Sequence, residues 1–244
     1  MSDQGDGLRS SCEWSPARGG PRRRRWDQIM TAVDVGRWSR DNGLGRTTMG
    51  RIAVVNFVSL DGVIQSPLSP EEDRDGGFEG GGWVSSSSDD TVNDFMRNAT
   101  VGAAGMLMGR RTYDIFTDAW SQANDAQPAV AAMNRMPKYV VTSSTDRLGW
   151  QNSHRVDGDL APAVRSLKEE SDGDLVVFGS GTLIRALAEN DLVDEYRLLI
   201  FPVVLGAGKR MFGEDGYPAH FTLTGSVISP NGVAILTYTH NRAA

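Results

Sequence analysis

The sequence predicts an α/β fold: a mixed, mostly parallel central sheet with helices on both faces and antiparallel strands at its C-terminal end. From residue 51 onward, short apolar runs alternate with segments whose apolar residues recur at the three- and four-residue spacing of an amphipathic helix. After residue 195 the helical spacing stops, and three strand-like stretches follow with turn residues between them.

The first element is the apolar run at residues 51–58, and its nearly continuous hydrophobicity is typical of a buried central strand. Residues 65–88 form a long loop rich in glycine, serine, proline and acids, which in a compact domain is either functional or disordered. A helix begins at Asp89 or Asp90, because acidic residues are favoured at the positive end of a helix dipole. A short strand at residues 105–108 follows.

The later elements are predicted on the same grounds. A helix ends before Pro137, because the residue before a proline disfavours the helical backbone. Pro230, Asn231 and Gly232 predict a hairpin turn between the last two strands. The expected elements are helices from 110 and at 126–135, a strand at 138–142, a helix from 159, a strand at 175–178, a helix around 183–187, and strands at 195–205, 221–229 and 233–240.

Residues 1–48 differ from the rest of the chain. They are rich in arginine, glycine and serine, include four arginines in a row from Arg22 to Arg25, and show no sustained apolar period. Such a segment buries too little surface to offset its chain entropy. We therefore expect a disordered extension, with a single folded domain over residues 49–244. A basic targeting or nucleic-acid-binding arm is the alternative, although the continuous apolar core of a secretory signal is absent.

Composition narrows the class of protein. With 39% hydrophobic and 23% charged residues, the 244-residue chain resembles an ordinary globular protein, and no apolar run is long enough to predict a membrane span. Cys12 is the only cysteine, which fits a cytoplasmic location. His154, His220 and His240 are far apart, so no metal site is expected. The net charge of −6 argues against nucleic acid as a partner and leaves a small-molecule substrate.

Three strand-to-helix turns contain residues suited to binding an anion, and ligands in this kind of sheet bind beyond the carboxyl ends of the strands. In the first turn, Gly109 permits close approach of a ligand to the backbone. Arg110, Arg111 and Thr112 then add two guanidinium groups and a hydroxyl at a helix N-terminus. An ordinary surface helix, with its arginines paired to nearby acids, is the alternative interpretation.

The other two turns are less specific. One offers hydroxyls for a ribose or a phosphate, or simply for capping the turn: Thr142, Ser143 and Ser144. The other places small residues before an amphipathic helix, as in turns that cradle a phosphate on backbone amides: Gly179, Ser180, Gly181, Thr182 and Leu183. Because neighbouring turns of one sheet meet at one edge, the three together predict a nucleotide site.

These segments occur in the order of a known family. The matching stretches are Ser59-Leu60-Asp61-Gly62 and residues 107–113, 141–143, 178–183, 192–198 and 201–209. Over about residues 51–240 the chain resembles the reductase domain of the bifunctional riboflavin-biosynthesis deaminase-reductase, which has the three-layer dihydrofolate reductase fold. The resemblance implies a cytoplasmic NADPH-dependent reductase that acts on a phosphoribosylamino-pyrimidine or pterin-like substrate. A homodimer is a further expectation from the resemblance. A catalytically inactive NADPH-binding regulatory or interaction protein of the same fold is the alternative.

The resemblance also implies roles for individual residues. It places the cofactor on Asn56, Gly109, Arg110, Arg111, Thr112, Thr142, Ser143, Ser144, Gly179, Ser180, Gly181, Thr182 and Leu183. Substrate contacts fall on Ser59, Asp61, Gly62 and, if the 65–88 loop closes as a lid, Trp83. Two departures are the missing zinc deaminase half and Ser180, which stands where dihydrofolate reductases have a second glycine.

Reduction also requires a proton, which a carboxyl group with a raised pKa in an apolar pocket would supply. Dihydrofolate reductase has an acid on the helix after its lid loop, where this chain has Asp89, Asp90 and Asp94. We take Asp90 as the candidate proton donor and Asp61 as the second. The alternatives are acids that stabilise a helix start and an aspartate that shapes a turn.

Overall fold

The protein is described by a computed structural model over residues 49–213 and 217–241, so the predicted extension over residues 1–48 lies outside the described residues. Within these ranges, one eight-stranded sheet has the order β4-β3-β2-β5-β1-β6-β8-β7. Its strands pair in parallel from β4 to β6 and antiparallel from β6 through β8 to β7. The predicted mixed sheet is therefore confirmed.

In chain order, the elements are β1 (Arg51–Ser59), the 3-10 helices η1 (Asp75–Gly77) and η2 (Trp83–Ser86), α2 (Asp90–Val101), β2 (Gly105–Gly109), α3 (Arg110–Trp120), α4 (Pro128–Arg135), β3 (Lys138–Val141), β4 (Ser153–Val156), α5 (Leu160–Glu170), β5 (Asp174–Phe178), α6 (Gly181–Glu189), β6 (Glu195–Phe201), β7 (Phe221–Ile228) and β8 (Ala234–His240).

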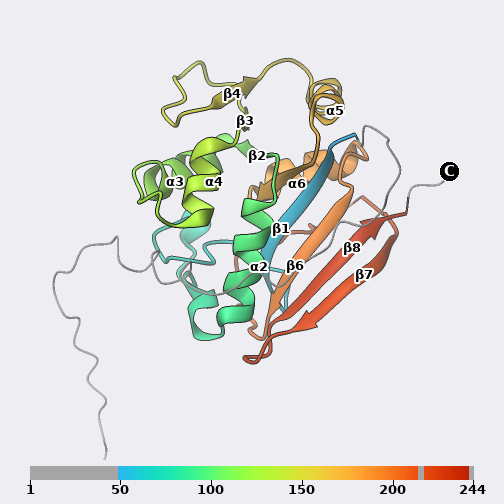
Figure 1. The fold of residues 1–244 in the computed structure, drawn as a ribbon. Coiled ribbons are helices and arrows are strands. Elements are labelled where there is room, and N and C mark those ends of the chain that lie inside the picture. Colours follow the sequence, from blue (N-terminus) through green and yellow to red (C-terminus); the bar gives the residue numbers. More distant parts are fainter. Residues whose placement is uncertain (1–48, 214–216, 242–244) are drawn as a thin grey trace, which may run out of the picture.

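Helices cover both faces of the sheet, as Figure 1 shows for α2, α3 and α4 on one side and α5 and α6 on the other. Because successive side chains of a strand point to opposite faces, β1 contributes to two separate cores. Val55 packs in the core that includes residues of α2, α3 and α4, and Val54 packs in the core with α5 and α6. This double burial explains the continuous apolar run of β1. None of the helices in the described ranges is long and apolar enough to span a membrane.

Two strand predictions differ from the structure. The strand predicted at 195–205 ends at Phe201, because Pro202 has no N–H to donate to a neighbouring strand. The strand β4 was not predicted, because its Ser-His-Arg-Val sequence contains no apolar run and it lies at the sheet edge beside β3. The predicted final hairpin turn is confirmed, with the Gly232 N–H donating to the Ser229 carbonyl at 2.9 Å.

Strand β6 lies between β1 and β8 in the interior of the sheet, and this position accounts for its apolar residues. The predicted homodimer, for which those residues were one indication, stays a prediction.

The 65–88 loop is held against the sheet by specific contacts. The indole N–H of Trp83 donates to the Gln65 carbonyl at 2.9 Å, and its ring packs edge-on against Phe201 with centroids 5.6 Å apart. The Gln65 amide in turn donates to the carbonyls of Asp73 and Asp75 at 3.1 and 2.9 Å. The loop is thus an ordered wall beside β1.

Candidate functional site

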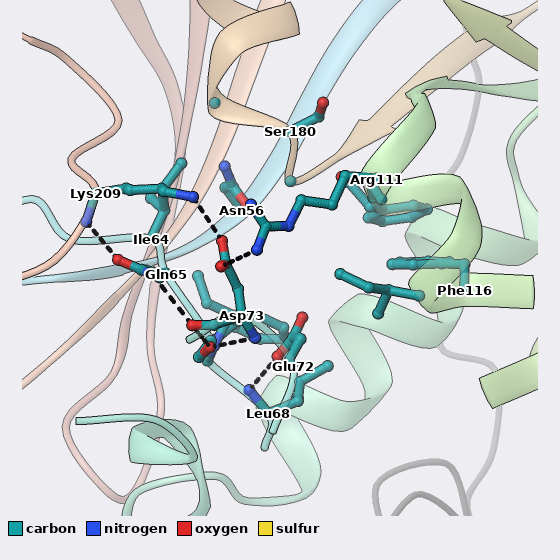
Figure 2. Close-up of a pocket in the computed structure, with 18 of the residues that line it drawn as sticks. Asn56, Ile64, Gln65, Leu68, Glu72, Asp73, Arg111, Phe116, Ser180 and Lys209 are labelled. Atoms are coloured by element: carbon teal, nitrogen blue, oxygen red, sulfur yellow. Dashed lines mark hydrogen bonds and ion pairs between the residues drawn. The ribbon is translucent and has the colours of Figure 1, made fainter. Parts of the chain in front are cut away.

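A cavity of about 490 Å³ opens beside the C-terminal half of β1. Its walls come from β1, the segment that follows it, α2, α3 and the turn between β5 and α6. Figure 2 shows these elements converging around Asn56 and Asp73. The volume lies within the range of roughly 300–1,000 Å³ that is typical of small-molecule sites. The position agrees with the sheet edge at which the sequence predicts a ligand.

Two of the three predicted turns meet at this cavity. Arg111 and Thr112 line it from the start of α3, and four residues of the other turn line it from the start of α6: Gly179, Ser180, Gly181 and Thr182. Gly109 lies where the turns touch, because a Cβ atom built on it would be only 2.3 Å from the Ser180 Oγ. Gly179 and Ser180 have positive φ angles of 68° and 64°, which turn the chain sharply into α6.

Apart from Asn56, the remaining predicted cofactor residues do not line the cavity. Leu183 is buried in the core beneath α6. The Arg110 Nε contacts the Asp114 carboxylate at 2.9 Å, as in an ordinary helix i,i+4 pair. In the third turn, the Thr142 hydroxyl accepts the Ser144 N–H at 3.0 Å, which is a capping arrangement, and neither these two residues nor Ser143 lines the cavity.

Asn56 lines the cavity as a buried residue with an unused hydrogen-bonding group. It is 5% exposed, and its Nδ2 has no hydrogen-bond partner among the described residues. A buried unpaired donor costs about 1–3 kcal/mol, so buried donors in native proteins almost always have a partner. A ligand oxygen in the cavity would supply that partner.

The cationic side of the cavity is already paired with acids of the 65–88 loop. The Arg111 guanidinium contacts Asp73 at 2.6 Å and Asp75 at 3.1 Å. The Lys209 ammonium contacts the same two carboxylates at 3.0 and 2.7 Å, and Figure 2 shows the contacts of Asp73 with both cations. Hydrogen bonds from Lys209 and Arg111 hold the pKa of Asp75 below its usual value. We call these four residues the ion cluster.

Glu72 lines the cavity next to the ion cluster but has a different environment. One of its carboxylate oxygens accepts the Leu68 N–H at 3.1 Å (Figure 2). Burial raises the pKa of Glu72 above its ordinary value, and the negative charge of neighbouring Asp73 raises it further. The sequence did not single out Glu72, since no local pattern separates it from the other acids of the loop.

Neither of the two predicted proton donors lines the cavity. Asp61 accepts hydrogen bonds from the Ser59 hydroxyl at 2.6 Å and from the N–H groups of Leu205 and Gly206 at 3.1 and 2.8 Å. These bonds hold the pKa of Asp61 far below its ordinary value, so it is an ionised turn anchor. Asp90 is exposed in the first turn of α2 and does not line the cavity.

The predicted substrate contacts also lie outside the cavity lining. Ser59 is 1% exposed and accepts the Val63 N–H at 2.9 Å. Gly62 has a φ of 83°, which the turn after β1 requires. Trp83 is buried and anchors the loop. Helix α2 presents Met96 and Thr100 to the cavity, a spacing of four residues that places both on one helical face.

Comparison with known proteins identifies the family and the fold. Residues 51–235 match the family model described as the RibD C-terminal domain. The uncharacterized protein YyaP of Bacillus subtilis is 25% identical over 194 residues, which cover 78% of this chain and 95% of YyaP. A candidate riboflavin biosynthesis protein from Shewanella sp. PV-4 has a TM-score of 0.61 at 22% identity, over 79% of this chain and 99% of its own.

A second structural neighbour is a dihydrofolate reductase. The enzyme from Enterococcus faecalis, complexed with NADP(H), has a TM-score of 0.52 at 14% identity, over 80% of this chain and 98% of its own. The predicted dihydrofolate reductase-like fold is confirmed by this likeness.

Proposed function

The chain belongs to the RibD C-terminal domain family, and from this premise we propose that it is an NADPH-dependent reductase. It transfers a hydride to a C=N or C=O carbon of a pterin-like or phosphoribosyl-pyrimidine substrate. The family and the dihydrofolate reductase-like fold support a function of the reductase type. The choice of cofactor and substrate is supported by the residues of the cavity.

The observation that carries the cofactor proposal is the unpaired Nδ2 of Asn56 at the wall of a cavity that also reaches two anion-suited turns. The N–H groups at the start of α6 and the Arg111 guanidinium suit the pyrophosphate of a dinucleotide. Asn56 then lies where it would donate to an oxygen at the nicotinamide end. Bound NADPH supplies the hydride, and the protein contributes position and exclusion of water.

The substrate proposal is supported by the mixed character of the cavity. Phe116 lines it and stacks on Phe178 with ring centroids 6.1 Å apart, and Met96 adds a further apolar surface. These groups suit a flat heterocycle. Arg185 and Arg210 also line the cavity, outside the ion cluster, and guanidinium groups suit the phosphate of a phosphoribosyl substrate.

The first test measures binding of NADPH and NADH to the full chain. Binding is monitored as quenching of tryptophan fluorescence, because Trp120 lines the cavity. Arg111→Ala removes a charged donor and should weaken NADPH binding by about 10- to 100-fold. Arg135→Ala is the matched control, because Arg135 is exposed on α4 outside the cavity. Absence of NADPH binding would refute the cofactor assignment, and equal binding by all three proteins would refute the role of Arg111.

The second test is oxidation of NADPH in the presence of 5-amino-6-(5-phosphoribosylamino)uracil or 7,8-dihydrofolate. Oxidation that depends on one of these compounds supports the reductase and identifies its substrate class. Tight NADPH binding without oxidation of either compound would favour the inactive NADPH-binding protein.

A further inference from the structure

The cavity is lined by three acids, and only Glu72 has surroundings that favour its protonated form. Asp73 and Asp75 are each paired with Arg111 and Lys209 in the ion cluster, which favours their ionised forms. Glu72 accepts a backbone N–H from Leu68, and within the described ranges it forms no ion pair with a basic side chain.

Helix α2 supplies no acid to the cavity. Its lining residues are Met96 and Thr100, and the Thr100 hydroxyl donates to the Met96 carbonyl of its own helix at 2.8 Å. Asp94 pairs with Arg97 at 2.7 Å, and Asp90 is exposed at the helix start. The acids that line the cavity come instead from the segment after β1, and one of them is Glu72.

We propose that Glu72 is the general acid of this cavity. The proposal rests on the reductase function proposed above. While the substrate carbon of the C=N or C=O group accepts the hydride, the adjacent nitrogen or oxygen takes the carboxyl proton of Glu72, directly or through one water molecule. The C=N or C=O group is reduced, the dinucleotide is oxidised, and the resulting glutamate regains its proton from solvent before the next turnover.

The surroundings of Glu72 favour its protonated form. Burial disfavours the charged carboxylate and outweighs the Leu68 N–H bond, which favours it, and the neighbouring Asp73 carboxylate repels a second negative charge. The cations that line the cavity are Arg111 from α3, Arg185 from α6, and Lys209 and Arg210 from the segment before β7. The Arg111 and Lys209 charges are matched by those of Asp73 and Asp75, so they stabilise an ionised Glu72 only weakly.

If Glu72 were only structural, its role would be to hold the loop through the hydrogen bond from the Leu68 N–H. Glutamine has an amide oxygen at the same place and would still accept the Leu68 N–H, so Glu72→Gln separates the proton from the hydrogen bond. Because the glutamine amide is neutral, like the protonated carboxyl group, this variant should be about as stable as the wild type at neutral pH. Glu72→Asp keeps the acid on a shorter side chain. Glu71→Gln is the matched control, since Glu71 is an exposed acid of the same loop that pairs with Arg74.

The experiment compares the four full-length proteins in three measurements. Fluorescence titration measures NADPH binding, which should be similar in all four. Infrared spectra of the NADPH complexes are recorded from acidic to neutral pH. The difference between wild type and Glu72→Gln reports protonation of the Glu72 carboxyl group. Stopped-flow oxidation of NADPH, with the pyrimidine or dihydrofolate as substrate, should slow by about 10²- to 10⁴-fold in Glu72→Gln. The oxidation rate of Glu72→Asp should lie between those of Glu72→Gln and the wild type, and Glu71→Gln should react at the wild-type rate.

The outcomes separate this proposal from the proposed function. If NADPH binds but the infrared signal shows Glu72 ionised down to the ordinary glutamate pKa of about 4.3, Glu72 is not the acid. Substrate-dependent oxidation that survives in Glu72→Gln overturns the assignment in the same way, and in both cases the reductase function stands. Absence of NADPH binding in the wild type overturns both proposals. A carboxyl group that keeps its proton toward neutral pH in the NADPH complex supports Glu72.

Discussion

Replacing Asp73 by asparagine is expected to tighten the binding of a pyrophosphate-containing ligand. Asp73 contacts Arg111 at 2.6 Å and Lys209 at 3.0 Å, so it holds both cations that a bound phosphate would need. Asparagine keeps the side-chain oxygen that accepts the Asp75 N–H at 3.0 Å, and the local turn should therefore persist. The substitution removes the competing negative charge and replaces the oxygen that accepts from Lys209 by an amide nitrogen.

The magnitude follows from the exposure of the two ion pairs. The Asp73 side chain is 15% exposed, but its partners Arg111 and Lys209 are 57% and 46% exposed. Solvent screening limits such pairs to about 0.5–1 kcal/mol each, or about 1–2 kcal/mol in total. If the ligand regains that free energy, its dissociation constant falls by about 5- to 30-fold. The gain should shrink with added salt, because exposed charges are screened.

The assay is a fluorescence titration of the full chain with NADPH, and with inorganic pyrophosphate as a smaller probe. Glu71→Gln removes one negative charge from the same loop without touching Arg111 or Lys209, and it controls for the change in net charge. Equal tightening by the two variants would show that long-range charge is responsible. Unchanged or weaker binding by Asp73→Asn would refute the competition between loop and ligand.

Two further variants test the framework of the site. Lys138→Met should lower the free energy of unfolding by about 3 kcal/mol. The fully buried Lys138 ammonium donates to three carbonyls at the end of α4, at 2.6, 3.1 and 2.9 Å, and methionine leaves all three without this donor. That loss corresponds to a melting temperature about 6–12 °C lower, and a shift of 1 °C or less by circular dichroism would contradict it. Gly109→Ala should destabilise the fold and weaken NADPH binding, since the new Cβ meets the Ser180 Oγ. Adding Ser180→Gly should restore most of both, and purely additive effects would disprove the contact.

The fold was predictable because its signals are local. Hydrophobic spacing identified β1 and the βα alternation, and Pro230, Asn231 and Gly232 identified the last hairpin. The edge strand β4 was missed because strand pairing, rather than its own composition, makes it a strand. Its parallel partner β3 supplies the hydrogen bonds, and this pairing cannot be read from four mostly polar residues.

Residues of the candidate site could be predicted only where they lie together on one strand-to-helix turn. The Arg111 and Gly179 turns meet at the cavity because β2 and β5 are neighbours, a pairing that the sequence did not specify. Contacts between distant segments were not accessible. Lys209 binds Asp73 across 136 positions of sequence, and neither residue has a local signal that names the other. Trp83 looked like a lid residue from its loop, but its indole packs inward as an anchor.

The loop contacts also indicate how a ligand enters without dismantling the site. The loop backbone is fixed independently of the ion cluster, because the Gln65 amide binds two loop carbonyls and its oxygen accepts the Lys209 N–H at 2.9 Å. If a ligand phosphate replaces the Asp73 and Asp75 carboxylates, rotation of Asp73 gives up its bond from the Asp75 N–H, while the Gln65 bonds still hold the loop backbone. Glu72 is held by its own bond from Leu68, so exchange of charges beside it leaves its carboxyl group facing the same cavity.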